Sequence, residues 1–147
     1  MKTLHSERDR AEIADRLNRL SPGQEARWGK MNAPQMVVHL ADALRMATGD
    51  LAVRGKDTFL RYPPVKKLII YVLPFPKGAP TARELQSRVP TSWGREMADL
   101  QALITGFAAH ANRSEWPNHP VFGRMSREDW GALAYKHSDH HLKQFGA

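Results

Sequence analysis

Apolar residues recur three or four positions apart in four separate stretches of this chain, and no stretch alternates polar and apolar residues for long enough to predict a β-strand. The predicted helices cover about residues 7–20, 33–48, 91–111 and 127–144. The third has the clearest apolar stripe: Trp93, Met97, Leu100, Ile104 and Phe107. We therefore predict an all-α fold, a bundle of four main helices.

Capping signals support these boundaries. Ser6, Asn32 and Ser126 each precede a predicted helix, and an acidic residue or glutamine follows each of them three positions later. Gly49 and Gly146 lie just beyond the second and last helices, where a left-handed residue commonly ends a helix.

A proline-rich segment separates the second and third main helices. Six of the ten prolines lie between Pro63 and Pro90, so no long uninterrupted helix can form there. Two adjacent prolines can still begin a short extra helix over Pro63–Leu73, which Pro74 must end. We expect the following residues, Phe75–Thr81, to form an extended, ordered loop.

Length and composition limit the chemistry. A chain of 147 residues is long enough to bury one core, so we predict a single domain over residues 1–147. There is no cysteine, which excludes disulfides, cysteine zinc fingers, iron–sulfur clusters and a cysteine nucleophile. Any metal must therefore be held by imidazole and oxygen ligands.

The sequence predicts neither a membrane span nor secretion. Its longest apolar run, Leu68–Leu73, is far shorter than the roughly 20 residues that cross a bilayer. The segment Met1–Asp9 is charged and lacks the apolar region of a secretory signal. We expect a cytoplasmic protein.

The formal net charge of +7 raises the question of nucleic-acid binding. Basic residues are interspersed with acids, and Lys66-Lys67 is the only adjacent lysine pair, so a solvated basic surface explains the charge more simply. No glycine-rich dinucleotide motif, phosphate loop or Gly-x-Ser-x-Gly motif is present.

Three of the seven histidines fall within five residues of the last predicted helix: His137, His140 and His141. On an α-helix, His137 and His141 lie about 40° apart around the axis and about 6 Å apart along it, so both rings can reach one point. They continue the apolar stripe and should face the interior. His140 is rotated away and should lie at the margin or face a neighbouring helix.

A metal site needs a further ligand, and His39, beside the apolar face of the second helix, is the best candidate. Three neutral imidazoles with an open position form a catalytic metal pattern, because the ion keeps its full charge. Asp42 and Asp139 are the acids available to hold the rings from outside.

Other interpretations of the histidines remain open. Each ring could be a hydrogen-bonded core or surface histidine. Ser138 follows His137, so the His-Glu-x-x-His motif of zincin proteases is absent. We expect His110 to end a helix, His5 to lie near a frayed terminus, and His119 to serve a turn or edge a pocket.

Two histidine-containing motifs together resemble the DinB-like (YfiT-like) metalloenzyme superfamily. The first is Trp28-Gly29-Lys30-Met31 leading into Met36–Asp42, and the second runs from Trp130 to Gly146. The segments Leu73–Thr81 and His119–Gly123 are similar to an uncharacterised branch of that group. The resemblance extends from about residue 16 onward.

Members of the superfamily are four-helix bundles, and the resemblance implies that His39, His137 and His141 bind a divalent zinc, nickel or iron ion. It also implies a homodimer, a small-molecule substrate, and metal-dependent hydrolysis or reactions of a low-molecular-weight thiol such as bacillithiol, mycothiol or glutathione. Since the chain has no cysteine, any thiol would be a cofactor. The competing hypothesis is a non-catalytic binding or dimerisation module with a structural histidine cluster.

Overall fold

The computed structural model describes residues 1–147 and is entirely helical, which confirms the predicted all-α class. It has no β-strand; one isolated bridge joins His119 and Gly123. The five α-helices are α1 (Glu7–Leu17), α2 (Ala33–Thr48), α3 (Pro63–Tyr71), α4 (Trp93–Gly106) and α5 (Arg127–Gln144). Three 3-10 turns supplement them: η1 (Phe59–Arg61), η2 (Arg83–Leu85) and η3 (Phe107–His110).

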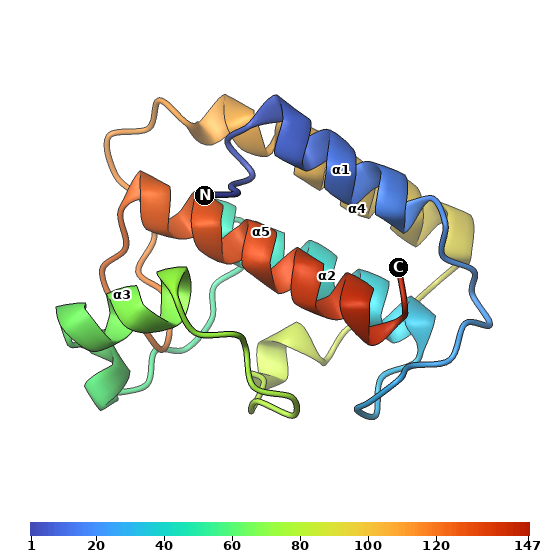
Figure 1. The fold of residues 1–147 in the computed structure, drawn as a ribbon, viewed down its shortest axis with the longest axis horizontal. Helices are drawn as coiled ribbons and strands as arrows, with labels where there is room; N and C mark the ends of the chain where they lie inside the picture. The colour runs from blue at the N-terminus through green and yellow to red at the C-terminus, as the bar shows by residue number, and fades with distance from the viewer.

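The four longer helices lie in two layers (Figure 1). α1 and α5 lie in front, with α4 behind α1 and α2 behind α5. Contacts close the arrangement, because α1 and α2 each pack against both α4 and α5. α3 packs on α5 from outside.

The boundaries of α2 and α5 are those predicted. Asn32 and Gln35 exchange side-chain and backbone hydrogen bonds in a capping box, as do Ser126 and Asp129. Gly49, with φ 85°, takes the left-handed conformation that ends α2. These two helices carry the candidate histidines, so their capped ends set the position of each histidine along its helix.

The other helices are shorter than predicted. α1 ends at Leu17, because the Leu20 amide donates to the Leu17 carbonyl in a tighter turn. α4 begins at Trp93 and tightens into η3 after Gly106, so the single helix predicted over 91–111 is two elements. α3 ends two residues before Leu73.

The prediction that His5 lies near a frayed terminus is wrong. Leu4 is fully buried, and its amide donates to the Gly131 carbonyl of α5 over 3.1 Å. The His5 Nε2 lies 3.0 Å from the Arg127 carbonyl. Because a Cβ at Gly131 would collide with the side chains of Thr3 and His5, glycine permits this close approach. The N-terminal segment is thus part of the packed structure.

The proline-rich loop between α3 and α4 is present as predicted, with η2 as its one regular turn. Leu85 of η2 is buried, and η2 packs against α2. This contact brings the backbone of the loop to the helix that carries His39. No helix of the protein has both the length and the apolar character required to cross a bilayer.

Candidate metal centre

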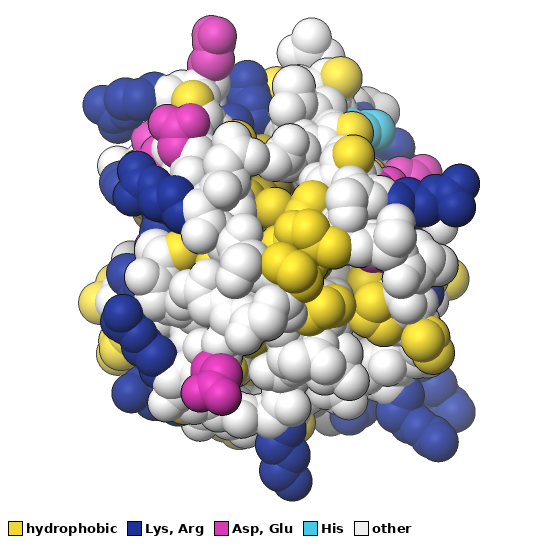
Figure 2. Space-filling view, turned by 90° about the vertical axis from the view of Figure 1, so that its right-hand side faces the viewer, with side chains coloured by type: hydrophobic (Ala, Val, Ile, Leu, Met, Phe, Trp, Pro, Cys, Tyr) yellow, Lys and Arg dark blue, Asp and Glu magenta, His cyan; other side chains and the backbone are white.

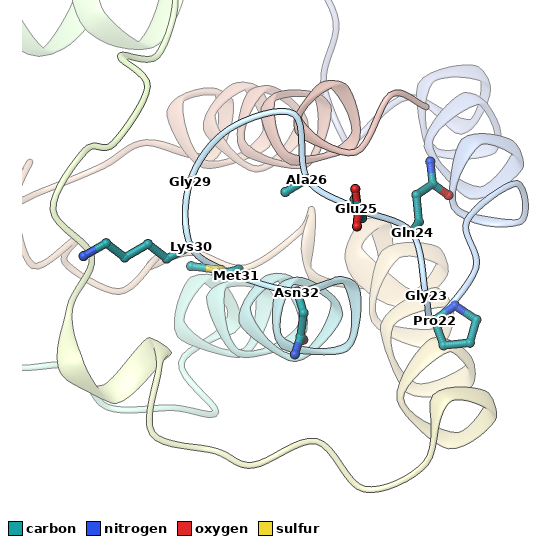
Figure 3. A pocket seen from close by; sticks show the side chains of 9 residues that line it. All are labelled: Pro22, Gly23, Gln24, Glu25, Ala26, Gly29, Lys30, Met31 and Asn32. Atoms are coloured by element: carbon teal, nitrogen blue, oxygen red, sulfur yellow. The ribbon is translucent and has the colours of Figure 1, made fainter.

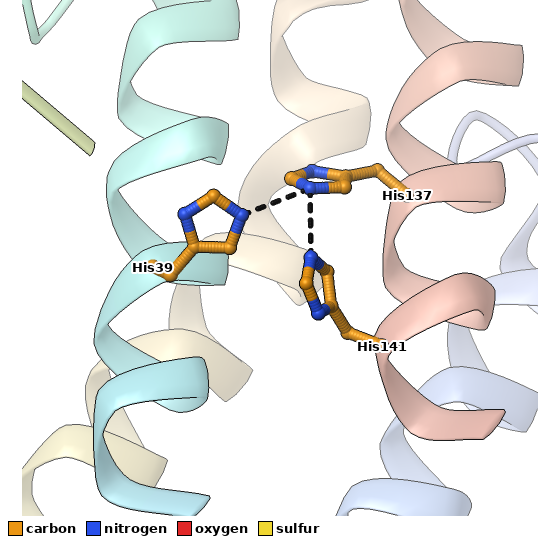
Figure 4. Close-up of side chains that lie close together, drawn as sticks. All are labelled: His39, His137 and His141. Atoms are coloured by element: carbon orange, nitrogen blue, oxygen red, sulfur yellow. Dashed lines mark hydrogen bonds between the residues drawn. The ribbon is translucent and has the colours of Figure 1, made fainter. Parts of the chain in front are cut away.

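Three histidine side chains from α2 and α5 point toward one another in the interior (Figure 4). The His137 Nε2 lies 3.0 Å from the His39 Nε2 and 3.1 Å from the His141 Nε2. One ring nitrogen from each of the three residues lies within 4.8 Å of the other two. The three residues predicted to meet therefore do so.

Two of the rings are held from outside by polar groups. The His39 Nδ1 lies 3.1 Å from the carbonyl of Leu85 in η2. The His141 Nδ1 lies 2.7 Å from the Gln144 Oε1, one helical turn further along α5. Both contacts leave Nε2 of these rings directed at His137.

The protonation of these rings follows from their partners. A backbone carbonyl only accepts, so the His39 Nδ1 must carry the proton, and in a neutral ring Nε2 then holds a lone pair. The same holds for His141 opposite the Gln144 oxygen. The single proton that the His137 Nε2 can offer cannot satisfy both lone pairs. A cation between the three nitrogens would satisfy them, so this donor set fits a metal ion.

The spacing also suits a metal. Nitrogens at about 2.0–2.1 Å from a tetrahedral ion lie roughly 3.3 Å apart, within a few tenths of an ångström of the two short separations. The third pair, His39 and His141, is more widely separated, at up to 4.8 Å, so these two rings would have to approach each other to bind one ion.

Burial keeps the three imidazoles neutral. It lowers the pKa of His39 against the opposing effects of the Leu85 carbonyl and the Asp42 charge. Burial and the neighbouring histidines hold the pKa of His137 well below its ordinary value. Burial, with His39 nearby, lowers the pKa of His141 to about 3. Neutral imidazole is the form that binds metals, so the rings are ready to do so at neutral pH.

Asp42 and Asp139, expected to hold the rings, have other partners. Asp42 is buried and bonds to Arg45 over 2.8 Å and to Arg88 over 3.2 Å. Asp139 bonds to Arg16 of the neighbouring helix α1 and to Lys143 one turn further along α5. The structure gives the role expected of these acids to the Leu85 carbonyl and Gln144 instead.

Aromatic side chains from two loops border the three histidines. The ring of Phe75 lies 6.2 Å from that of His137, and the ring of Trp28 lies 5.9 Å from that of His140. His140 contacts the rings of Trp28 and Phe75 and lies at the margin, one of its two expected places. The Lys77 amine lies 4.5 Å above the Trp28 ring, so the two loops meet here.

His119 lies in a turn. The amides of Val121 and Phe122 both donate to its Nδ1 over 3.1 Å. Burial lowers the pKa of His119 to about 4, and the two donated bonds also disfavour a proton on Nδ1. Its turn role is confirmed, and it takes no part in the three-histidine cluster.

A separate hollow of about 370 Å³ lies at the loop joining α1 to α2 (Figure 3). Its lining contains no histidine and one acidic residue, so it offers no comparable donor set. Figure 2 shows the end of the molecule that carries this loop. Basic side chains are scattered around its edge among acidic ones, and an apolar patch lies at its centre. This face has no continuous basic surface of the kind that binds nucleic acid.

The sequence pattern predicts the three histidines but not the groups that hold their rings from behind. Gln144 had a usable signal, because a residue three positions after His141 lies on the same helical face. The Leu85 carbonyl had none, since a backbone group in a proline-rich loop leaves no trace in side-chain patterns.

A family described as "Protein of unknown function (DUF1569)" has a model that matches residues 2–147. No curated protein and no solved structure matches this chain.

Proposed function

From the geometry of the site, we propose that this chain, which belongs to the DUF1569 family of unknown function, is a metal-dependent enzyme. His39, His137 and His141 are the ligands of one divalent ion, zinc, nickel or iron. The observation that carries the proposal is the convergence of three Nε2 atoms, two of which have their lone pairs fixed toward the third.

We also propose that the fold is a four-helix bundle of the DinB-like type. The packing of α1, α4, α2 and α5 supports this, because each of these helices contacts two of the others. The ligands come from the second helix and from a His-x-x-x-His pair on the last, as the resemblance implies. On the same basis we propose a homodimer, which light scattering of the purified protein would test.

A divalent ion held by three neutral ligands keeps its charge and acidifies bound water or a thiol. Residues of the chain orient the ligands and shield the site. The Leu85 carbonyl and Gln144 orient two of the imidazoles, and Phe75 and Trp28 limit the access of water from the loop side. The reaction is hydrolysis, or transfer or isomerisation with a low-molecular-weight thiol, on a small molecule.

Metal stoichiometry tests the proposal. Protein purified without a histidine tag is treated with chelator, dialysed against Zn²⁺, Ni²⁺ or Fe²⁺, and analysed for bound metal. We expect one ion per chain, and none for His39→Ala or His137→Ala. His110→Ala, outside the cluster, is the matched control and should bind like the unaltered protein. Equal binding by all variants would overturn the proposal.

The non-catalytic module also has an observation in its favour. The three rings pack edge to face at centroid distances of 4.8–4.9 Å, which stabilises a core without any ion. On that hypothesis, His39→Ala lowers the stability in chelator, and added metal changes the stability of neither variant nor parent.

A further inference from the structure

We propose that Gln144 is a positioning residue that sets the tautomer of His141, and so makes the His141 Nε2 available to a metal. The inference rests on the proposed metal site. It concerns the polar link from the backbone of Trp28 through the Gln144 amide to the His141 ring.

The direction of the Gln144 amide follows from its two neighbours. Its Nε2 donates to the Trp28 carbonyl over 2.6 Å, and a carbonyl can only accept. The amide oxygen must therefore face the His141 Nδ1, which has to carry the ring proton. An unconstrained histidine populates two tautomers. Here the Trp28 carbonyl orients the Gln144 amide, and the amide oxygen then favours the His141 tautomer with its proton on Nδ1.

Burial makes this choice costly to reverse. Gln144 is 5% exposed and His141 is 8% exposed, so water cannot readily replace either bond. Turning the amide over would place two acceptors together at Trp28. With Nδ1 still protonated, it would also place two donors together at His141. Unmade buried hydrogen bonds of this kind are expensive.

The backbone beside Trp28 is shaped to receive the amide. Gly29 has φ 83°, and a Cβ there would lie 2.5 Å from the Gln144 Nε2. The Arg27 amide also donates to the main-chain carbonyl of Gln144 over 2.7 Å. Residues 27–29 thus hold both the side chain and the backbone of this one residue.

His39 and His141, the two proposed ligands on either side of His137, are held in different ways. His39 uses a backbone carbonyl directly, at Leu85, whereas His141 reaches a backbone carbonyl through a side chain. Only the second arrangement can be removed by substitution without moving the main chain, which makes it testable.

The test is the His141 tautomer in metal-free protein, measured by long-range ¹⁵N–¹H NMR of ¹⁵N-histidine-labelled samples, together with Co²⁺ titration monitored by visible absorption. Gln144→Met keeps the size of the side chain and removes its polar groups. We expect His141 to lose its preference for the Nδ1–H form and the Co²⁺ dissociation constant to rise about 10–100-fold. His39 should keep its tautomer.

Gln144→Glu restores an acceptor for the His141 Nδ1, and a proton on its other oxygen replaces the donor to the Trp28 carbonyl, so we expect the Nδ1–H form to return with Co²⁺ affinity well above that of Gln144→Met. The matched control is Gln101→Met, which removes a glutamine bonded to Asn18 outside the site and should change neither readout. If Gln144→Met does not fold, Gly29→Ala supplies the same test, because its Cβ displaces the amide from Trp28.

A folded Gln144→Met protein with an unchanged His141 tautomer and unchanged Co²⁺ affinity would overturn the inference. This outcome differs from failure of the proposed metal site, in which Co²⁺ binding is equally insensitive to His39→Ala. The tautomer is measured without metal, so the two results are independent.

Discussion

The Nε2 atoms of His39 and His137 lie 3.0 Å apart although 98 positions separate the two residues in the sequence. They can meet only when α2 and α5 are packed together in the folded chain. A ligand that binds both rings therefore binds the native state in preference to the unfolded one, and must stabilise it.

We accordingly expect Zn²⁺ to raise the melting temperature of the chelator-treated protein. Free metal at 100 times its dissociation constant adds about 2.7 kcal/mol, which is roughly 5–10 °C for a chain of this size. Circular dichroism melts with and without Zn²⁺ measure the shift. His141→Ala should abolish it, whereas an undiminished shift in that variant would show that zinc binds elsewhere.

Stability should also depend on the half-buried, neutral His119. Its pKa is about 4 in the folded protein and near 6.5 when unfolded, so between these values the unfolded chain binds more protons. The stabilisation is complete above about pH 6.5 and is lost as the pH falls toward 4, by up to about 3 kcal/mol. Urea unfolding in chelator at several pH values measures it. His119→Gln should show a shallower loss, and an identical slope would contradict the assignment.

Alanine should destabilise α5 at Gly131 although it usually stabilises a helix. The new Cβ would collide with Thr3 and His5, and such overpacking costs about 1–3 kcal/mol. Gly94 in α4 has open space around it, so Gly94→Ala should instead stabilise by roughly 0.5–1 kcal/mol. Chemical denaturation of the two variants gives the comparison. Equal effects would mean that the N-terminal segment is not held against α5.

Arg88 should be essential to the junction between the proline-rich loop, α2 and α4. It bonds to Asp42 over 3.2 Å and to Glu96 over 2.7 Å, and both acids are almost fully buried. Arg88→Met leaves the buried Glu96 without a cation and Asp42 with Arg45 alone, and we expect a loss of about 2–4 kcal/mol in the free energy of unfolding.

Adding Glu96→Gln to Arg88→Met should recover part of that loss, since one buried charge is removed. Lys2→Met, which breaks an exposed pair with Glu12, is the control and should have little effect. If the double variant is as unstable as Arg88→Met alone, the uncompensated charge of Glu96 is not the cause.

The sequence predicted those features that depend on local pattern. Helix α5 was predicted in full, because its capping pair and apolar stripe agree, and the same stripe placed His137 and His141 together. His39 was found because it lies beside the apolar face of α2. Periodicity and helix geometry suffice for such positions.

Features that depend on tertiary contact were missed. Asp42 was expected at the histidines from its distance along α2, yet Arg88, from a loop with no regular pattern, holds it elsewhere. His5 was expected to lie near a frayed terminus, but burial of Leu4 and its backbone hydrogen bond to Gly131 hold this segment against α5. Partners from distant loops determine both outcomes, and a single sequence does not show them.

The closed packing of α1, α4, α2 and α5 has a consequence for ion selectivity. The three ring nitrogens proposed as ligands are attached to two neighbouring helices, so the distance between the axes of α2 and α5 would limit the metal–nitrogen bond lengths that they can make. Proteins discriminate among transition metals through geometry more than through raw affinity. If the proposed site binds an ion, the packing of buried residues on these two helices, such as Leu40 of α2 and Leu142 of α5, would influence which metal fits.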